Sequence, residues 1–249
     1  MAILEMHGLV KRFGGLLATD RLSLTIEPGE LHAVIGPNGA GKTTLINQLS
    51  GEIIPDEGRI VFDGHDLTRE PPYKRALAGL GRSYQITSVF GDFTVLQNTA
   101  LAVQSHAGHS FRFWRPADRE PELVEPALAA LRQVGLEARA DTPVAALAHG
   151  ERRQLEIAMV LATGAKLLLL DEPMAGMSQA ESEAVVELLR GLKRRHSILL
   201  VEHDMDAVFA LADRITVLVY GHPVASGTPE QIRVHPEVRE AYLGEQEAG

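Results

Sequence analysis

One glycine-rich stretch of the chain has the residue types that bind phosphate. Residues 36–44 read GPNGAGKTT and match the pattern G-x-x-x-x-G-K-[ST]. The glycines allow successive backbone N–H groups to face phosphate oxygens, and a helix that follows adds the positive end of its dipole. Lys42 would reach the outer phosphates, and Thr43 would offer its hydroxyl to Mg²⁺. This stretch predicts a nucleotide clamp made of Gly36, Pro37, Asn38, Gly39, Ala40, Gly41, Lys42, Thr43 and Thr44.

Two adjacent carboxylates follow an apolar run later in the chain. Leu167–Leu170 read as a buried strand and lead directly into Asp171 and Glu172. The carboxyl ends of strands in open α/β sheets are where ligands bind, so these acids are expected beside the phosphate loop. We expect Asp171 to hold Mg²⁺, directly or through water, and Glu172 to orient or deprotonate the water that attacks the terminal phosphate.

Three further residues are weaker candidates when each is taken alone. His203 ends the apolar run LLVEHD and could donate a hydrogen bond to phosphate, although a histidine at a strand end often has no such task. Gln85, in RSYQIT, is an ordinary polar residue between a strand and a helical region. Phe13 is more often a core residue than a contact for a nucleobase, although aromatic faces do stack on bases.

The elements that must position these residues form an α/β pattern. LHAVI, KLLLLD, SILLV and ITVLV read as buried strands that alternate with helical segments, which favours a parallel sheet with right-handed crossovers. Near the N-terminus, LSLTI and RIVF flank turn residues and predict antiparallel strands. Residues 90–160 are mostly helical in pattern, as in ELVEPALAALRQVGL, and predict an inserted helical lobe.

Composition excludes several other classes of protein. The 249 residues include no cysteine, so the chain has no disulfide or thiolate metal site. The formal net charge of −9 argues against a broad nucleic-acid surface, and we expect no nucleic-acid partner. The start of the chain lacks the pattern of a secretory signal, and the longest charge-free run, residues 93–111, is too polar for a bilayer helix.

Taken together and in order, these motifs resemble those of the ATP-binding subunits of ABC transporters, over about residues 3–243. GPNGAGKTT is similar to the Walker A motif, Gln85 to the Q-loop, LAHGE to the signature, LLLLDE to Walker B, AGMS to the D-loop and His203 to the switch histidine. The resemblance implies a P-loop NTPase core with a parallel sheet, an N-terminal antiparallel β subdomain and an inserted helical subdomain. It implies ATP and Mg²⁺ as ligands, with Phe13 on the adenine and Gln85 near the metal.

The expected domain organisation follows from the same resemblance. We expect a single ABC ATPase domain over residues 1–249. Its nucleotide-binding core, with the β subdomain, would comprise residues 1–84 and 161–225. Residues 85–160 would form the helical subdomain, and residues 226–249 a C-terminal extension.

The signature departs from the usual family pattern. In the family this motif lies at a helix N-terminus and contacts the ATP held by the opposite subunit, which implies that His149, Gly150 and Glu151 contribute to a neighbour's site. Gly150 would let the backbone approach the terminal phosphate without a side chain in the way. The family usually has serine where Ala148 stands and glycine where His149 stands, and Ser178 replaces an acid or amide in the D-loop. We still expect a working ATPase, with His149 as a substitute donor.

Finer resemblances suggest the type of transporter. RFGGLLATD, the insert QSHAGHSFRFWRPADREPE and the ending ASGTPEQIRVHPEVREAYLGE look like the ATPase subunits of branched-chain amino acid importers, with urea and amide importers as close competitors. That implies a second ATPase subunit, identical or not, integral membrane permease subunits, an indirect relation to a solute-binding protein, and a place on the cytoplasmic face of the cell membrane. Alternatives are an ABC ATPase of DNA repair or translation, a regulatory module that binds ATP without hydrolysis, and an unrelated P-loop kinase or GTPase.

Overall fold

The chain forms two β-sheets and a set of helices packed around them. The computed structural model describes residues 1–83, 89–106 and 120–238. Its four-stranded antiparallel sheet has the order β2-β1-β4-β5, and its six-stranded sheet has the order β10-β9-β3-β8-β7-β6. The strands are β1 Leu4–Phe13, β2 Leu16–Ile26, β3 Leu31–Ile35, β4 Glu57–Phe62, β5 His65–Asp66, β6 Leu80–Arg82, β7 Leu167–Asp171, β8 Ser197–Val201, β9 Arg214–Val219 and β10 His222–Gly227.

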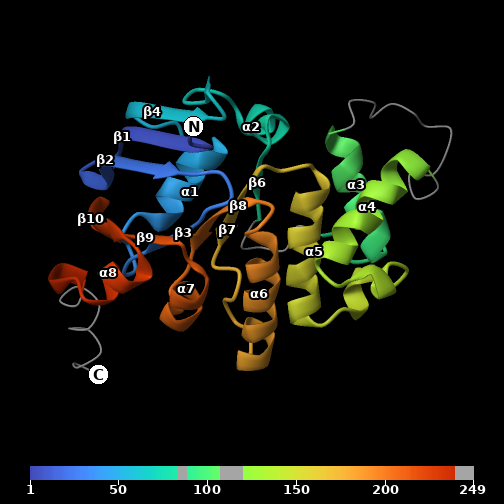
Figure 1. The fold of residues 1–249 in the computed structure, drawn as a ribbon. Coiled ribbons are helices and arrows are strands. Elements are labelled where there is room, and N and C mark those ends of the chain that lie inside the picture. The colour runs from blue at the N-terminus through green and yellow to red at the C-terminus, as the bar shows by residue number, and fades with distance from the viewer. Residues whose placement is uncertain (84–88, 107–119, 239–249) are drawn as a thin grey trace.

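The helices lie on both faces of the larger sheet and in a block to one side of it (Figure 1). They are α1 Lys42–Ser50, α2 Pro72–Ala78, α3 Val95–His106, α4 Pro121–Gln133, α5 His149–Ala162, α6 Gln179–Leu192, α7 Met205–Leu211 and α8 Pro229–Arg233, with short 3₁₀ turns at Glu137–Arg139 and Val144–Ala146.

The run of leucines in β7 explains how the larger sheet is buried. Leu168 and Leu170 pack into one apolar core with helices α5, α6 and α7. Leu167 and Leu169 pack into a second core, which contains α1 and the inner face of the antiparallel sheet. Because a strand places successive side chains on opposite faces, a strand covered on both sides needs apolar residues at every position. The predicted α/β fold with its parallel sheet is therefore confirmed.

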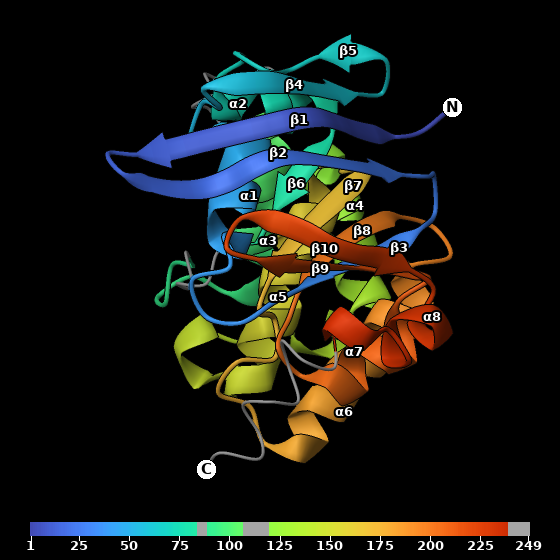
Figure 2. The same cartoon turned by 90° about the vertical axis from the view of Figure 1, so that its left-hand side faces the viewer.

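The two sheets lie one above the other with α1 between them (Figure 2). Within the larger sheet, β6, β7, β8, β3 and β9 are parallel, and β10 pairs antiparallel with β9 at the edge. The two predicted antiparallel segments, LSLTI and RIVF, lie in β2 and β4, whereas β1, β5, β10 and α2 were not predicted. The domain boundaries expected from the sequence remain a prediction.

Helix α3, helix α4 and helix α5 pack against one another as the block at one side of the sheet (Figure 1). Leu123, Ala127, Leu131 and Val134 are all buried, so this face of α4 was predicted correctly.

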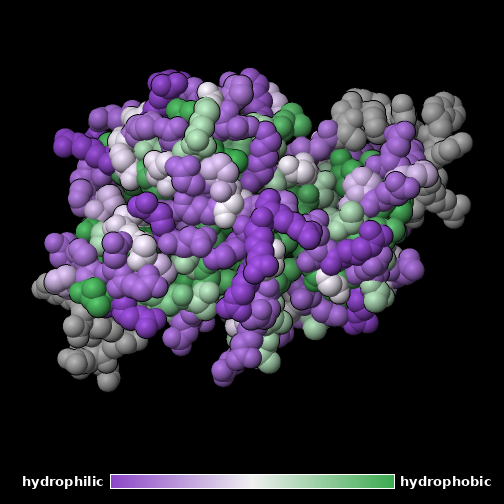
Figure 3. All heavy atoms as spheres, viewed as in Figure 1, coloured by the Kyte–Doolittle hydropathy of each residue, from purple (hydrophilic) through white to green (hydrophobic). Residues whose placement is uncertain are grey.

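Within the described parts of the chain, no helix is long and apolar enough to cross a bilayer. The face drawn in Figure 3 is mostly hydrophilic, with hydrophobic residues in small groups.

Candidate nucleotide-binding site

The glycine loop connects the buried strand β3 to helix α1, as its sequence predicts. Gly36 ends the strand so close to β9 that a Cβ atom there would lie 2.3 Å from the Leu218 carbonyl oxygen. Gly41 caps the start of α1 with a φ of 100°, and a Cβ atom there would lie 2.2 Å from the Ala18 carbonyl oxygen. Only glycine fits either position. The loop is thus pressed against two strands, while Asn38 and Gly39 at its tip are exposed.

Lys42 lies at the start of α1 with its ammonium group turned back over the loop. Its Nζ donates to the carbonyl oxygens of Gly36, at 2.6 Å, and Pro37, at 3.1 Å. Burial lowers the pKa of Lys42, and the charges of Glu172 and Asp171 oppose that shift. The lysine and both predicted acids therefore interact at one site, although they are more than 120 positions apart in the sequence. Thr43 is exposed on the first turn of the helix, and Thr44 is half-buried.

Asp171 ends β7 as a buried carboxylate, only 1% exposed. Burial raises its pKa, and the charge of Arg82, whose Nη2 lies 3.6 Å from Oδ2, opposes this. Its Oδ1 atom has no hydrogen-bond partner within the described ranges. A buried carboxylate oxygen without a partner is costly unless something binds it.

The donor set near Asp171 fits Mg²⁺. Mg²⁺ prefers oxygen ligands and is usually held by one or two protein groups together with the phosphates of a nucleotide. Asp171 offers its unpaired oxygen, and Thr43 a hydroxyl on the adjoining helix. Of the residues that the structure describes, no three histidines or acids are grouped as a metal site, so a cation here would also need ligands from the nucleotide.

Glu172 and His203 are brought together by the pairing of β7 with β8. The backbone N–H of Glu172 donates to the Val201 carbonyl oxygen at 2.8 Å. The Nδ1 atom of His203 lies 4.0 Å from Glu172 Oε1 and 3.7 Å from Glu202 Oε2. The His203 side chain is 62% exposed, so it is available to a ligand in front of the sheet.

Glu202 organises this end of the sheet and was not predicted as a site residue. It is fully buried, and its carboxylate accepts hydrogen bonds from the backbone N–H groups of Met174, at 2.9 Å, and His203, at 3.0 Å. It thus ties the segment after Walker B to the switch histidine. Its position directly after the apolar run of residues 198–201 was the available sequence signal, because a carboxylate buried at the end of such a run must find donors.

Gly150 lies in the first turn of α5, as the signature motif predicts. The helix is capped by Ala148, whose backbone N–H donates to the Glu151 carboxylate at 3.0 Å, so only half of a capping box is present. Arg139 binds Glu151 and lowers its pKa. His149 is exposed.

The signature and the D-loop are joined within the chain. The backbone N–H of Gly150 donates to Glu181 Oε1 at 3.3 Å, while Ser178 Oγ donates to the other oxygen of Glu181 at 2.7 Å. Helix α5 packs mainly on α3, α4 and α6, whereas α1 packs on α2 and on strands β2, β6 and β7. The signature therefore lies in the helical block, and the phosphate loop lies at the sheet, in a different region of the fold.

Two candidates are less well placed by the structure. Phe13 ends β1 with 47% of its surface exposed, and the Lys11 ammonium lies 5.7 Å from its ring centroid. Its role at a nucleobase stays a prediction. Gln85 lies outside the described residues, and its role likewise stays a prediction.

Comparison with known proteins identifies the family of this chain. The model of the family described as ABC transporter matches residues 19–175, and that of the branched-chain amino acid ATP-binding cassette transporter matches residues 222–248. The chain is 41% identical to the high-affinity branched-chain amino acid transport ATP-binding protein BraF of Pseudomonas aeruginosa, over 98% of each chain. It is 40% identical to LivG of Escherichia coli, also over 98% of each.

Solved structures give the same result. A nucleotide-free ATP-binding cassette of an ABC transporter is 30% identical, with a TM-score of 0.86, over 97% of this chain and 99% of that one. The ADP conformation of another such cassette is 31% identical, with a TM-score of 0.87, over 98% and 99%. The chain therefore belongs to the ABC transporter family, as one of its ATP-hydrolysing subunits.

Proposed function

We propose that this chain hydrolyses ATP to energise an importer of branched-chain amino acids. The observation that carries this proposal is the convergence of Lys42, Asp171, Glu172 and His203 at the ends of adjacent parallel strands. The solute class is supported by the relatives BraF and LivG and by the C-terminal match to the branched-chain amino acid cassette.

Each residue of the site has a defined task in this proposal. The glycine loop and Lys42 bind the β- and γ-phosphates, and the Asp171 carboxylate and the Thr43 hydroxyl hold Mg²⁺. When bound, Mg²⁺ would neutralise charge on the phosphate oxygens. Glu172 accepts a proton from the attacking water, and His203 donates a hydrogen bond to the γ-phosphate.

The start of α5 completes the site of a second subunit. Gly150 places a backbone N–H at the positive end of a 14-residue helix, which favours an anion. Glu181 Oε1 accepts this N–H at 3.3 Å in the single chain, and a phosphate oxygen would take the place of that carboxylate oxygen. Because α5 and α1 lie in different parts of the chain, we propose that this N–H meets the ATP held by another ATPase subunit, which is either a copy of this chain or a related one.

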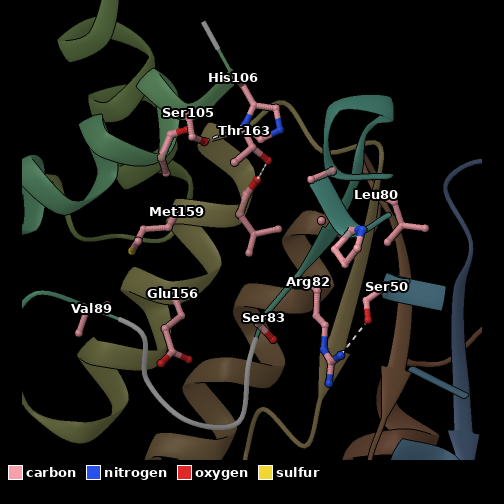
Figure 4. Close-up of a pocket in the computed structure, with 15 residues that line it drawn as sticks. Ser50, Leu80, Arg82, Ser83, Val89, Ser105, His106, Glu156, Met159 and Thr163 are labelled. Atoms are coloured by element: carbon pink, nitrogen blue, oxygen red, sulfur yellow. Dashed lines mark hydrogen bonds between the residues drawn. The ribbon is translucent and has the colours of Figure 1, made fainter. Parts of the chain in front are cut away.

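A groove beside the helical block is the proposed contact for the membrane permease subunits. It has a volume of about 340 Å³ and is bordered by β6, α3 and α5 (Figure 4). Its apolar lining includes Leu80, Val89, Ala102, Met159 and Val160. An apolar groove of this kind suits a helix from a partner. The chain would then act at the cytoplasmic face of the cell membrane, and a solute-binding protein would be only an indirect partner.

Uptake by the reconstituted transporter tests this proposal. The chain is purified with its permease subunits, placed in proteoliposomes with internal MgATP, and supplied with a solute-loaded binding protein outside. We expect ATP-dependent uptake of radiolabelled leucine, isoleucine or valine, and none with Glu172→Gln. Uptake of urea or short amides in place of these amino acids would refute the solute class, and hydrolysis without any uptake would refute transport.

A further inference from the structure

Arg153, on the second turn of α5, binds the backbone that carries both acids of the site. Its Nη2 donates to the carbonyl oxygens of Asp171 and Glu172, each at 3.1 Å, and its Nε donates to that of Pro173 at 3.1 Å. The side chain is 9% exposed. One guanidinium therefore holds three consecutive carbonyl groups, which a planar fork of donors does well and an ammonium does poorly.

The backbone that Arg153 holds is not in a relaxed conformation. Glu172 has a φ of 47°, in the left-handed region that a residue with a side chain rarely adopts. Such a conformation costs of the order of 1–3 kcal/mol and persists only where neighbouring bonds enforce it. Here the Glu172 N–H bond to Val201 enforces it from one side and Arg153 from the other. The direction of the Glu172 side chain depends on this conformation.

Glu156, one turn further along α5, fixes Arg153. Its Oε2 atom lies 2.5 Å from Arg153 Nη1, and the residue is 7% exposed. Its other oxygen, Oε1, has no hydrogen-bond partner within the described ranges. Glu156 borders the groove of Figure 4 and also a smaller cavity that Glu172 lines. The ion pair therefore stands between the groove and the hydrolytic acid.

We propose that Arg153, held in place by Glu156, is a positioning residue that sets Glu172 for hydrolysis. The inference rests on the proposed function, because it takes Glu172 as the group that activates water. Arg153 contacts the backbone of Asp171 and Glu172 and not their carboxylates in the bonds described above. It acts by holding the peptide groups on both sides of Glu172, so its loss misplaces the carboxylate without removing it. A misplacement of about 1 Å costs a reaction of the order of a hundredfold in rate.

Arg153→Lys tests the proposal, with Arg152→Lys as its matched control. Lysine keeps the positive charge but lacks the planar set of N–H donors that binds several carbonyl groups at once. We expect kcat to fall about tenfold to a hundredfold, while KM and the affinity for MgATP stay within about twofold, because the phosphate loop is untouched. Arg152 donates instead to the Ala145 carbonyl oxygen at 3.0 Å, and its variant should keep the kcat of the parent. A role confined to stability would lower the melting temperature and leave kcat of the folded protein unchanged.

A double-mutant cycle with Glu156→Gln shows whether the pair acts as one unit. We expect Glu156→Gln to lower kcat as well, and the double variant to be no slower than the slower single variant. Losses that multiply, or full kcat in folded Arg153→Lys protein, would overturn the inference. If Arg153→Lys does not fold, Glu156→Gln, which keeps the guanidinium, is measured instead. A lowered kcat at an unchanged KM would support the inference, and an unchanged kcat would overturn it. Normal hydrolysis by Glu172→Gln would overturn the proposed function, and this inference with it. Loss of hydrolysis in Glu172→Gln together with full kcat in folded Arg153→Lys would overturn this inference alone.

Discussion

Replacing Asp171 by asparagine should separate the cost of a buried charge from its use in binding MgATP. Asparagine keeps the shape of the side chain and an oxygen for Arg82, which lies 3.6 Å away. It removes a carboxylate that is 1% exposed and whose Oδ1 has no hydrogen-bond partner in the part of the chain that the structure describes. An ionised group in that setting opposes folding. We therefore expect the nucleotide-free variant to melt at or above the temperature of the parent.

The pH dependence of that difference has a defined sign. Burial raises the pKa of Asp171, so the folded state holds the proton more tightly than the unfolded state does. Stability of the parent should then fall, relative to Asp171→Asn, as pH rises from the unfolded-state pKa of about 3.9 through the folded-state pKa. Above that window the difference is complete and constant.

Addition of MgATP should reverse the order of the two proteins. A ligand at a hundredfold excess over its Kd stabilises a protein by about 2.7 kcal/mol, which for a chain of this size raises Tm by about 5–10 °C. If asparagine weakens binding about a hundredfold, the same concentration gives about 0.4 kcal/mol, or about 1–2 °C. The predicted result is that the Asp171→Asn protein is stable without nucleotide and that MgATP barely changes its melting temperature.

Thermal melts with and without MgATP, from pH 4 to pH 8, measure both effects. Asp141→Asn, at an exposed position, is the control and should behave as the parent does. A variant that melts below the parent without nucleotide, and is still stabilised by MgATP to the same extent, would refute the argument that Asp171 is a destabilising buried charge that binds the metal.

Three other substitutions test the loop, the signature and the switch histidine. Gly36→Ala should lower stability by about 1–3 kcal/mol in a thermal melt and abolish nucleotide binding, because its Cβ would lie 2.3 Å from the Leu218 carbonyl oxygen. Ala148→Ser should add about 1 kcal/mol to stability by capping α5, and should raise turnover if the hydroxyl also meets the partner's ATP; an unchanged melting temperature would rule out the cap. Glu202→Gln should lower kcat by loosening His203 at unchanged KM, and steady-state kinetics that match the parent would contradict that role.

The parts of the fold that were predicted correctly are those with a local physical cause. Four consecutive leucines before Asp171 indicate a strand covered on both faces, and both cores contain members of that run. Ser178 and Glu181 form the capping box that starts α6, because the stretch SQAE places a serine at the cap and a glutamate three residues later. The glycine loop was recognisable from its spacing of glycines, lysine and threonine, and the structure shows why Gly36 and Gly41 must be glycine, since both lie against neighbouring strands.

The parts that were missed depend on contacts between distant segments. Strand β10 exists because its backbone pairs with β9 at the sheet edge, while its own sequence, HPVASG, has a weak strand pattern. Arg82 and Arg153 read as ordinary charged residues, yet one approaches Asp171 and the other holds its carbonyl group. No spacing in the sequence indicates that these guanidinium groups lie beside the site, because strand β6 brings Arg82 there and the packing of α5 brings Arg153.

The most direct test of the central claim is the behaviour of Glu172→Gln with MgATP. In the proposed mechanism Glu172 acts on the water while the glycine loop and Lys42 bind the phosphates, so this substitution should abolish hydrolysis and leave binding intact. Calorimetry should give the variant the same affinity for MgATP as the parent, while kcat falls about 10²–10⁴-fold. A parent protein that binds no MgATP, or a variant that hydrolyses it at the parent's rate, would show that Glu172 is not the group that activates water at an ATP site of this chain.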